Sequence, residues 1–146
     1  MRTHMLDEAL AAPQCVARLL ERDATTYATL ARHLRQRPHD ALLTLARGSS
    51  DHAAQHLAYL VTARLSRLVT SLPMSVVTLY GARLPGAAMQ SFALSQSGQS
   101  PDLVEPTRAL RAAGAGTVAL VNDTASPLAS AAEFVLPLHA GAERSV

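Results

Sequence analysis

A chain of 146 residues, of which 49% are hydrophobic, is long enough for one well-buried domain and too short for two ordinary ones. The net charge is only +2 and every basic residue is arginine, which excludes chemistry that needs a lysine amine, such as a Schiff base or a P-loop lysine. The chain has few aromatic residues and no Trp for stacking on bases, and its arginines are spread along the sequence. We therefore expect no nucleic-acid partner.

Cys15 is the only cysteine, so no intramolecular disulfide can form and the composition does not point to an oxidising compartment. We expect Cys15 to be a buried, small apolar residue on an N-terminal helix. Asp7 and Glu8 lie near the N-terminus, and no apolar run reaches the length of a membrane span. These features predict a cytoplasmic protein without a signal peptide or a membrane partner.

The predicted elements begin with a helical N-terminal arm, in which apolar positions recur at helical spacing over residues 13–36 and Pro38 closes the pattern. Residues 41–46 predict a buried strand, which ends in a glycine-serine turn before a helix at 52–69. The remaining pattern predicts strands at 75–80, 91–94, 117–121 and 133–138, with helices at 102–113, stopped by Gly114, and at 127–132.

Strands and helices therefore alternate along the chain. Continuous apolar strands joined by helical crossovers imply an α/β fold with a five-stranded parallel sheet between two layers of helices. We expect an arm over residues 1–39 and a ligand-binding domain over residues 40–146. Such sheets bind ligands at the carboxyl ends of their strands, near the point where the strand order reverses.

The third predicted strand breaks into a loop rich in hydroxyl groups just before a helix. A loop of this kind lets the backbone approach an anion, the helix start offers unpaired N–H groups and the positive end of its dipole, and serine adds uncharged donors. The sequence therefore predicts a phosphate-binding loop formed by Ser95, Gln96, Ser97, Gly98 and Ser100.

Other candidates lie at the same predicted edge of the sheet. Gly48, Ser49 and Ser50 follow the first strand, whereas the Ser126–Pro127 pair is explained as an ordinary helix N-cap. His139 and Glu143 follow the last strand and are weak candidates for catalysis, and a solvated loop is the alternative.

Two histidines four residues apart could face a metal ion from one helix. For His52 and His56, however, no carboxylate or thiol ligand follows at a recognisable spacing. We expect a helix surface or a subunit interface there, with no metal and no cofactor.

Three motifs in this order resemble the SIS (sugar isomerase) domain over residues 40–146, and the predicted sheet would then be the doubly wound, flavodoxin-like SIS fold. The resemblance is nearest to the first SIS domain of tandem-domain enzymes, which include the isomerase part of glucosamine-6-phosphate synthase and related aminosugar-phosphate deaminases and isomerases. The motifs are Arg47-Gly48-Ser49-Ser50-Asp51-His52-Ala53, Ser95-Gln96-Ser97-Gly98 and His139-Ala140-Gly141-x-Glu143.

This resemblance implies binding of a hexose phosphate or aminosugar phosphate, such as glucosamine 6-phosphate or fructose 6-phosphate, by a likewise implied homodimer. In these families a glutamate of the second SIS domain moves the enediol proton and a histidine assists ring opening. The family pattern continues past Val146, so we expect a longer parent enzyme that supplies the catalytic groups. The implied ligand-binding residues are Gly48, Ser49, Ser50, Ser95, Gln96, Ser97, Gly98, Ser100 and Val146.

Three functions stay open at this point. Only about 40 residues precede the first strand, and they are too few for the glutaminase domain of glucosamine-6-phosphate synthase. This short N-terminal segment favours an aminosugar-phosphate deaminase or an aldose–ketose isomerase. A non-catalytic phosphosugar sensor, as in SIS-containing transcription regulators, is the first alternative. A single-domain sugar-phosphate isomerase is the second.

Overall fold

The sheet contains five parallel strands in the order β2-β1-β3-β4-β5, as seen in a computed structural model that describes residues 3–37 and 39–142. This order reverses direction between β1 and β3, as in doubly wound folds, and confirms the predicted α/β fold class. The strands are β1 (Ala41–Ala46), β2 (Val69–Ser71), β3 (Met89–Ser95), β4 (Gly116–Val121) and β5 (Phe134–Pro137).

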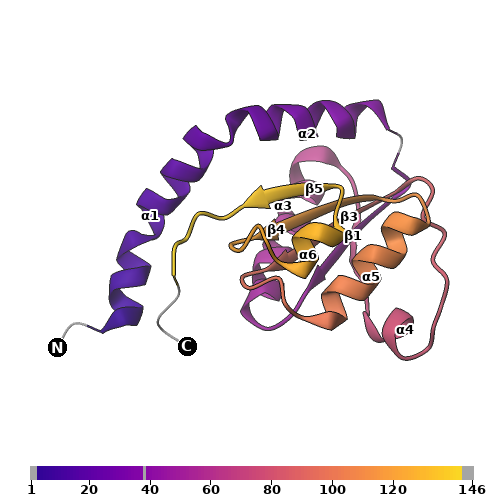
Figure 1. Cartoon of the computed structure of the whole chain (residues 1–146). Helices are drawn as coiled ribbons and strands as arrows, with labels where there is room; N and C mark the ends of the chain where they lie inside the picture. The colour runs from indigo at the N-terminus through magenta and orange to yellow at the C-terminus, as the bar shows by residue number, and fades with distance from the viewer. Residues whose placement is uncertain (1–2, 38, 143–146) are drawn as a thin grey trace.

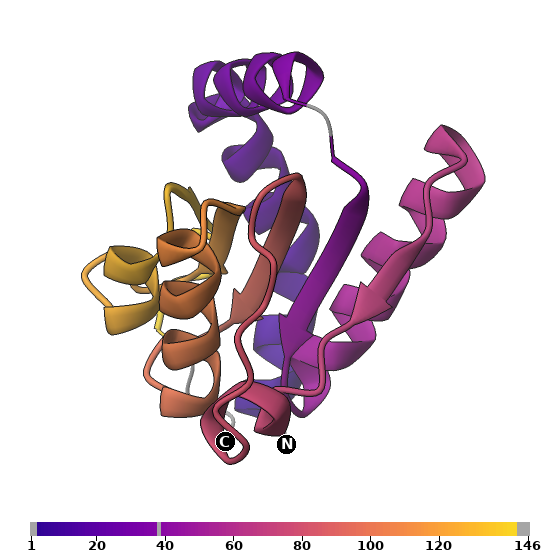
Figure 2. The ribbon, with the colours of Figure 1, turned by 90° about the vertical axis from the view of Figure 1, so that its right-hand side faces the viewer.

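Helices cover both faces of the sheet, because alternate strand residues point to opposite sides and most of them are apolar. One face packs against α5 (Pro101–Ala112) and α6 (Pro127–Ala131), and α4 (Ser75–Thr78) lies against α5. The other packs against α2 (Ala24–Gln36) and α3 (Ser49–Leu65). Figure 2 shows α5 and α6 on one side of the sheet and α3 on the other.

The N-terminal arm consists of two helices, because the chain changes direction at Asp23 between α1 (His4–Arg22) and α2. Leu30 anchors α2 by packing on Val118 and Leu136. In contrast, α1 buries none of its residues and extends past the ends of the strands (Figure 1). Five large apolar side chains of α1 are exposed: Met5, Leu6, Leu10, Val16 and Leu20.

The predicted strand at residues 75–80 is wrong. Its β-branched residues favour a strand locally, but residues 75–78 form the single turn α4, in which Met74 accepts backbone hydrogen bonds from Val77 and Thr78 at 3.0 Å each. The edge of β1 is already paired with β2, where Leu43 lies opposite Thr70. The strand count was therefore right although the second strand was misplaced.

The predicted helix at 52–69 was too late at both ends. It begins at Ser49, and it ends at Leu65 because Ser66 adopts a left-handed backbone with a φ of 53°. The chain then enters β2 at Val69. None of the helices in the described ranges combines the length and the apolarity that crossing a bilayer requires.

Candidate functional site

The loops that follow β1 and β3 leave the sheet side by side. These strands pair in register over their whole length, with Ala46 opposite Leu94 at their carboxyl ends. The β1 loop leads into α3 and the β3 loop into α5, so two helix N-termini start at one edge. The unpaired N–H groups and dipoles of such termini favour an anion.

The loop between β3 and α5 is held by one hydrogen bond within the loop and by two hydrogen bonds to other segments. Within the loop, the Gly98 N–H donates to the Ser95 Oγ at 3.0 Å. The carbonyl oxygen of Gln96 accepts from the Asn122 N–H at 3.0 Å, and that of Gly98 accepts from the Leu128 N–H at 3.1 Å. The loop is therefore tied to the segment after β4 and to α6, which gives a ligand a preformed surface.

Gly98 is required at its position for two reasons. Its φ of +64° is left-handed, a region that side chains disfavour. A Cβ atom there would also lie 2.6 Å from the Ser126 Cβ and closer still to its Oγ. Only glycine lets the loop pass this close to the start of α6.

The serines of this edge have different roles. Ser126 is fully buried and caps α6, since its Oγ accepts from the Ala129 N–H at 3.3 Å, as the sequence predicted. Ser100 occupies the equivalent position at α5, yet among the described residues its side chain makes no capping hydrogen bond. Ser97 is exposed. The hydroxyls of Ser97 and Ser100 therefore suit a ligand better than that of Ser126.

The loop after β1 contributes to the same edge. Gly48 has a φ of +57°, with Ser49 exposed and Ser50 half-buried behind it. A cavity of about 350 Å³ brings Ser50 together with Ser95 and Gln96, over a wall formed by α3. The structure thus gathers at one edge all the predicted ligand-binding residues that it describes, and Val146 lies outside the described residues.

An ion pair joins the two loops, because the Arg47 Nη2 donates to the Asp102 Oδ2. Arg47 directly follows β1, and Asp102 lies in the first turn of α5. Arg47 belongs to the first of the three sequence motifs, but its pairing with Asp102 was not predicted. Their positions after neighbouring strands of one parallel sheet were the available signal.

His139 contacts the N-terminal arm. Its Nε2 is 2.7 Å from the Oδ2 of Asp23, at the junction of α1 and α2, and its φ of 51° is left-handed. This geometry gives His139 a structural contact, and its catalytic role stays a prediction. Glu143 lies outside the described residues.

His52 and His56 are exposed residues of α3. In the ranges 3–37 and 39–142, no three His, Cys, Asp or Glu side chains form a group that could hold a metal ion.

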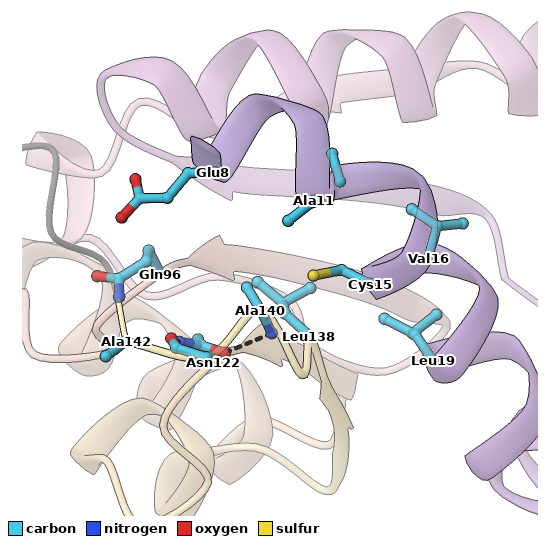
Figure 3. Close-up of a pocket in the computed structure, with 12 residues that line it drawn as sticks. Glu8, Ala11, Cys15, Val16, Leu19, Gln96, Asn122, Leu138, Ala140 and Ala142 are labelled. Atoms are coloured by element: carbon cyan, nitrogen blue, oxygen red, sulfur yellow. Dashed lines mark hydrogen bonds between the residues drawn. The ribbon is translucent and has the colours of Figure 1, made fainter. Parts of the chain in front are cut away.

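A second cavity, of about 380 Å³, lies between α1 and the loops that follow β3, β4 and β5 (Figure 3). Glu8 and Cys15 line it from the helix, and Gln96 and Asn122 line it from the loops. Sequence reasoning missed this cavity, because helical spacing places Glu8 and Cys15 on one face without showing what that face meets. Cys15 is half-buried rather than buried, and it accepts a hydrogen bond from the Arg18 Nη2 at 3.0 Å.

Comparison with known proteins identifies relatives of this fold. The glutamine–fructose-6-phosphate aminotransferase (isomerizing) of Thermus thermophilus is 31% identical over 129 residues, which are 88% of this chain and 21% of that protein. The structure of a proposed phosphosugar isomerase from Silicibacter pomeroyi DSS-3 is 43% identical, with a TM-score of 0.93 over 97% of this chain and 43% of that chain. The Vibrio vulnificus NanR protein complexed with ManNAc-6P shares the fold at 19% identity, with a TM-score of 0.75 over 89% of this chain and 48% of that chain.

The chain spans about a fifth of the curated relative and less than half of either solved chain. The family model of the SIS domain matches residues 34–146. This range includes α3, the whole sheet and the two serine loops, which are residues 48–50 after β1 and residues 95–100 at the end of β3. The resemblance drawn from the three sequence motifs is thereby confirmed, and the chain belongs to the SIS domain family.

Proposed function

We propose that this chain is the phosphosugar-binding domain of an enzyme that isomerises or deaminates aminosugar phosphates. One observation carries the proposal: two serine loops and two helix N-termini meet at the reversal point of a parallel sheet. This is the edge at which such sheets bind ligands. The names of the Thermus thermophilus and Silicibacter pomeroyi relatives support a phosphosugar as the ligand class.

A phosphate group fits the chemistry of this edge. The hydroxyls of Ser97 and Ser100 can donate to phosphate oxygens, and α5 directs its positive end toward the loop. Arg47 adds a cation beside the loop, partly neutralised by Asp102. This arrangement can hold a phosphate dianion without an unpaired, buried cation beside it. Such moderate attraction suits a ligand that must also be released.

The reaction that we propose is the conversion of an aminosugar phosphate and water to a ketose phosphate and ammonia, or the corresponding aldose–ketose isomerisation. Within either reaction, this domain would bind the phosphate and fix the open-chain sugar at the carboxyl edge. Such positioning lowers the entropic part of the barrier. The proton-transfer groups would come from outside the matched domain. In the Silicibacter pomeroyi relative, the part that matches this chain is 43% of the protein chain, so more than half of that chain lies outside the match.

The second candidate function is a phosphosugar sensor without catalysis. NanR, whose structure holds ManNAc-6P, shares this fold over most of the described chain. A sensor needs the same phosphate site but no turnover. Assay of the longest available form of the protein for ammonia release and isomerisation separates the two functions.

The binding experiment is calorimetric titration of the 146-residue chain with glucosamine 6-phosphate and fructose 6-phosphate, and with the unphosphorylated sugars as controls. We expect binding only with phosphate present. Ser97→Ala removes a donor to a charged group, so it should weaken binding of the phosphorylated sugars by about tenfold or more. Ser130→Ala, an exposed serine on α6, is the matched control and should leave affinity unchanged.

Equal affinity of the wild type and the Ser97→Ala variant would show that the loop is not the phosphate site. Binding that does not depend on phosphate would reject the proposed function.

A further inference from the structure

The cavity of about 350 Å³ over α3 is lined by residues of both serine loops. Ser50 contributes to it from the loop after β1, and Ser95 and Gln96 contribute from the end of β3. α3 forms a wall of this cavity, on the face of the sheet opposite α5 and α6 (Figure 2). The volume is that of a pocket for a small ligand, and the cavity adjoins the loop that we assign to phosphate. It therefore offers space for the sugar of a bound phosphosugar.

Most of this cavity is apolar. Aliphatic side chains from α3, from the strands and from the segment after β5 line it: Ala53, Leu57, Leu60, Leu94, Leu120 and Leu138. Such a surface can pack against the C–H groups of a sugar, but it cannot fix the positions of the hydroxyl groups. In pockets of this kind a few polar side chains set the orientation of the ligand.

His56 is the polar residue of this cavity that does not belong to a serine loop. Residues three and four apart share a face of a helix, so His56 lies beside Ala53 and Leu60, which line the same cavity. His56 follows Ser50 by six residues, a rise of about 9 Å along α3. The polar groups of the cavity therefore lie in two places, at the serine loops and further along α3.

The imidazole of His56 is available to a ligand. The residue is exposed, and within residues 3–37 and 39–142 its ring makes no hydrogen bond and no ion pair. A neutral imidazole has one nitrogen that donates and one that accepts, and a sugar hydroxyl can pair with either. By contrast, the Ser95 Oγ already accepts a hydrogen bond from the Gly98 N–H at 3.0 Å.

The order of these groups gives a bound phosphosugar a direction. Ser95 and Gln96 directly precede Ser97, so a phosphate held at Ser97 leaves the sugar next to the cavity. The carbon chain can then run along the aliphatic wall toward His56. In a hexose phosphate, the end of the chain remote from the phosphate carries hydroxyl and carbonyl oxygen atoms that can pair with the imidazole.

Building on the proposed function, we propose that His56 is a specificity-determining residue of the site, which binds oxygen atoms of the sugar at the end remote from the phosphate. The contact is a hydrogen bond and requires no proton transfer. The ligand class thereby narrows to phosphorylated sugars that are long enough to reach from the serine loops to His56. Shorter phosphate esters would bind through the phosphate alone.

The test compares fructose 6-phosphate with glycerol 3-phosphate, whose carbon chain is too short to reach His56. We expect His56→Ala to weaken binding of fructose 6-phosphate by about three- to tenfold, the effect of one lost hydrogen bond, and to leave the affinity for glycerol 3-phosphate unchanged. His56→Gln keeps a donor and an acceptor and should retain part of the affinity. His52→Ala is the matched control, since His52 is exposed one turn earlier on α3 and does not line the cavity; it should bind both ligands as the wild type does.

NMR gives an independent readout, because the chain has six histidines and the ring signals of His56 can be assigned by their loss in His56→Ala. Fructose 6-phosphate should shift these signals, whereas inorganic phosphate, which would occupy only the serine loop, should not.

Equal affinity of the wild type and His56→Ala for fructose 6-phosphate, or ring signals that this ligand leaves in place, overturns the inference while phosphate-dependent binding keeps the proposed function standing. An equal loss of affinity in His52→Ala also overturns it, because the effect would then belong to α3 as a whole. Absence of phosphate-dependent binding overturns the proposed function, and the inference with it.

Discussion

Arg47, directly after β1, and Asp102, in the first turn of α5, form an ion pair across the point where the strand order reverses. Both side chains are about half exposed, at 58% and 45%, so the pair adds at most about 1 kcal/mol to stability. Its larger effect is electrostatic, because it places one cation and one anion beside the loop that we assign to phosphate. The two residues should therefore affect ligand affinity in opposite directions.

Neutralising each partner separately tests this effect. Arg47→Gln should weaken binding of glucosamine 6-phosphate by about three- to tenfold, because it leaves Asp102 as an unpaired anion near the phosphate. Asp102→Asn should strengthen binding by a similar factor. Calorimetry at low and high salt measures both changes, and both should shrink as salt screens the charges.

Arg64→Gln, at the far end of α3, is the control for a general loss of positive charge and should have little effect. If both variants of the pair weaken binding equally, the pair acts by positioning the loops and not through its charges.

Replacement of Gly98 by alanine should destabilise the protein and abolish phosphosugar binding. The change combines a left-handed φ of +64° with a clash against Ser126, for an expected cost of about 2–4 kcal/mol in the free energy of unfolding. Urea unfolding measures the loss. Gly81→Ala is the matched control, since Gly81 has a φ of +59° but open space around its Cβ position.

The Gly81→Ala variant should lose only the free energy of unfolding that a left-handed backbone costs alanine, about 1–2 kcal/mol, and it should bind ligand normally. Equal losses for the two glycine variants would mean that the loop can move away from α6, and that contact with Ser126 does not fix its shape.

The sequence predicted the sheet and the serine loops well, because both depend on local signals. Buried strands such as residues 41–46 show as short apolar runs, and Gly98 marks the loop by its composition. The strand predicted at residues 75–80 failed because its β-branched residues carry no information about which sheet edge is still unpaired.

The site details that sequence reasoning missed are contacts between distant segments. Asp23 and His139 are 116 residues apart, and their meeting depends on how the arm lies against the sheet. The cavity beneath α1 depends on the same packing. A spacing pattern can place Glu8 on a helix face, but only the folded chain shows that this face looks onto the loops after β3 and β4.

The exposed apolar side chains of α1 favour the homodimer that the family resemblance implies. Leu10 and Leu20 are 55% and 58% exposed on a helix that buries no residue, which is unusual for leucines at helical spacing in a monomer. Leu10→Glu should shift sedimentation from dimer to monomer without loss of thermal stability. Leu79→Glu, at a 78% exposed position beside α4, is the control and should keep the dimer.

A wild-type chain that sediments as a monomer at all accessible concentrations would reject the homodimer. Dissociation caused equally by both variants would place the interface elsewhere than α1.

His39 should make stability depend on pH. Both of its ring nitrogens are buried without a hydrogen-bond partner in the part of the chain that the structure describes. Burial first, and then the positive charges of Arg37, His33 and Arg67, lower the pKa of His39 below its usual value of 6.5. Glu133 faces the same cluster and pairs with His33 and Arg37, at 3.9 and 3.6 Å.

The folded state binds a proton at His39 less readily than the unfolded state does. The free energy of unfolding is therefore highest above pH 6.5, and it decreases as the pH falls toward and through the lowered pKa of His39. Urea midpoints measured at a pH of about 7.5 and about 5.5 should therefore fall more for the wild type than for His39→Gln, which cannot titrate in this range. His56→Gln, on the exposed surface of α3, controls for the removal of a histidine and should behave like the wild type. An equal pH dependence in the wild type and the His39 variant would show that protonation of His39 leaves the junction between α2 and β1 undisturbed.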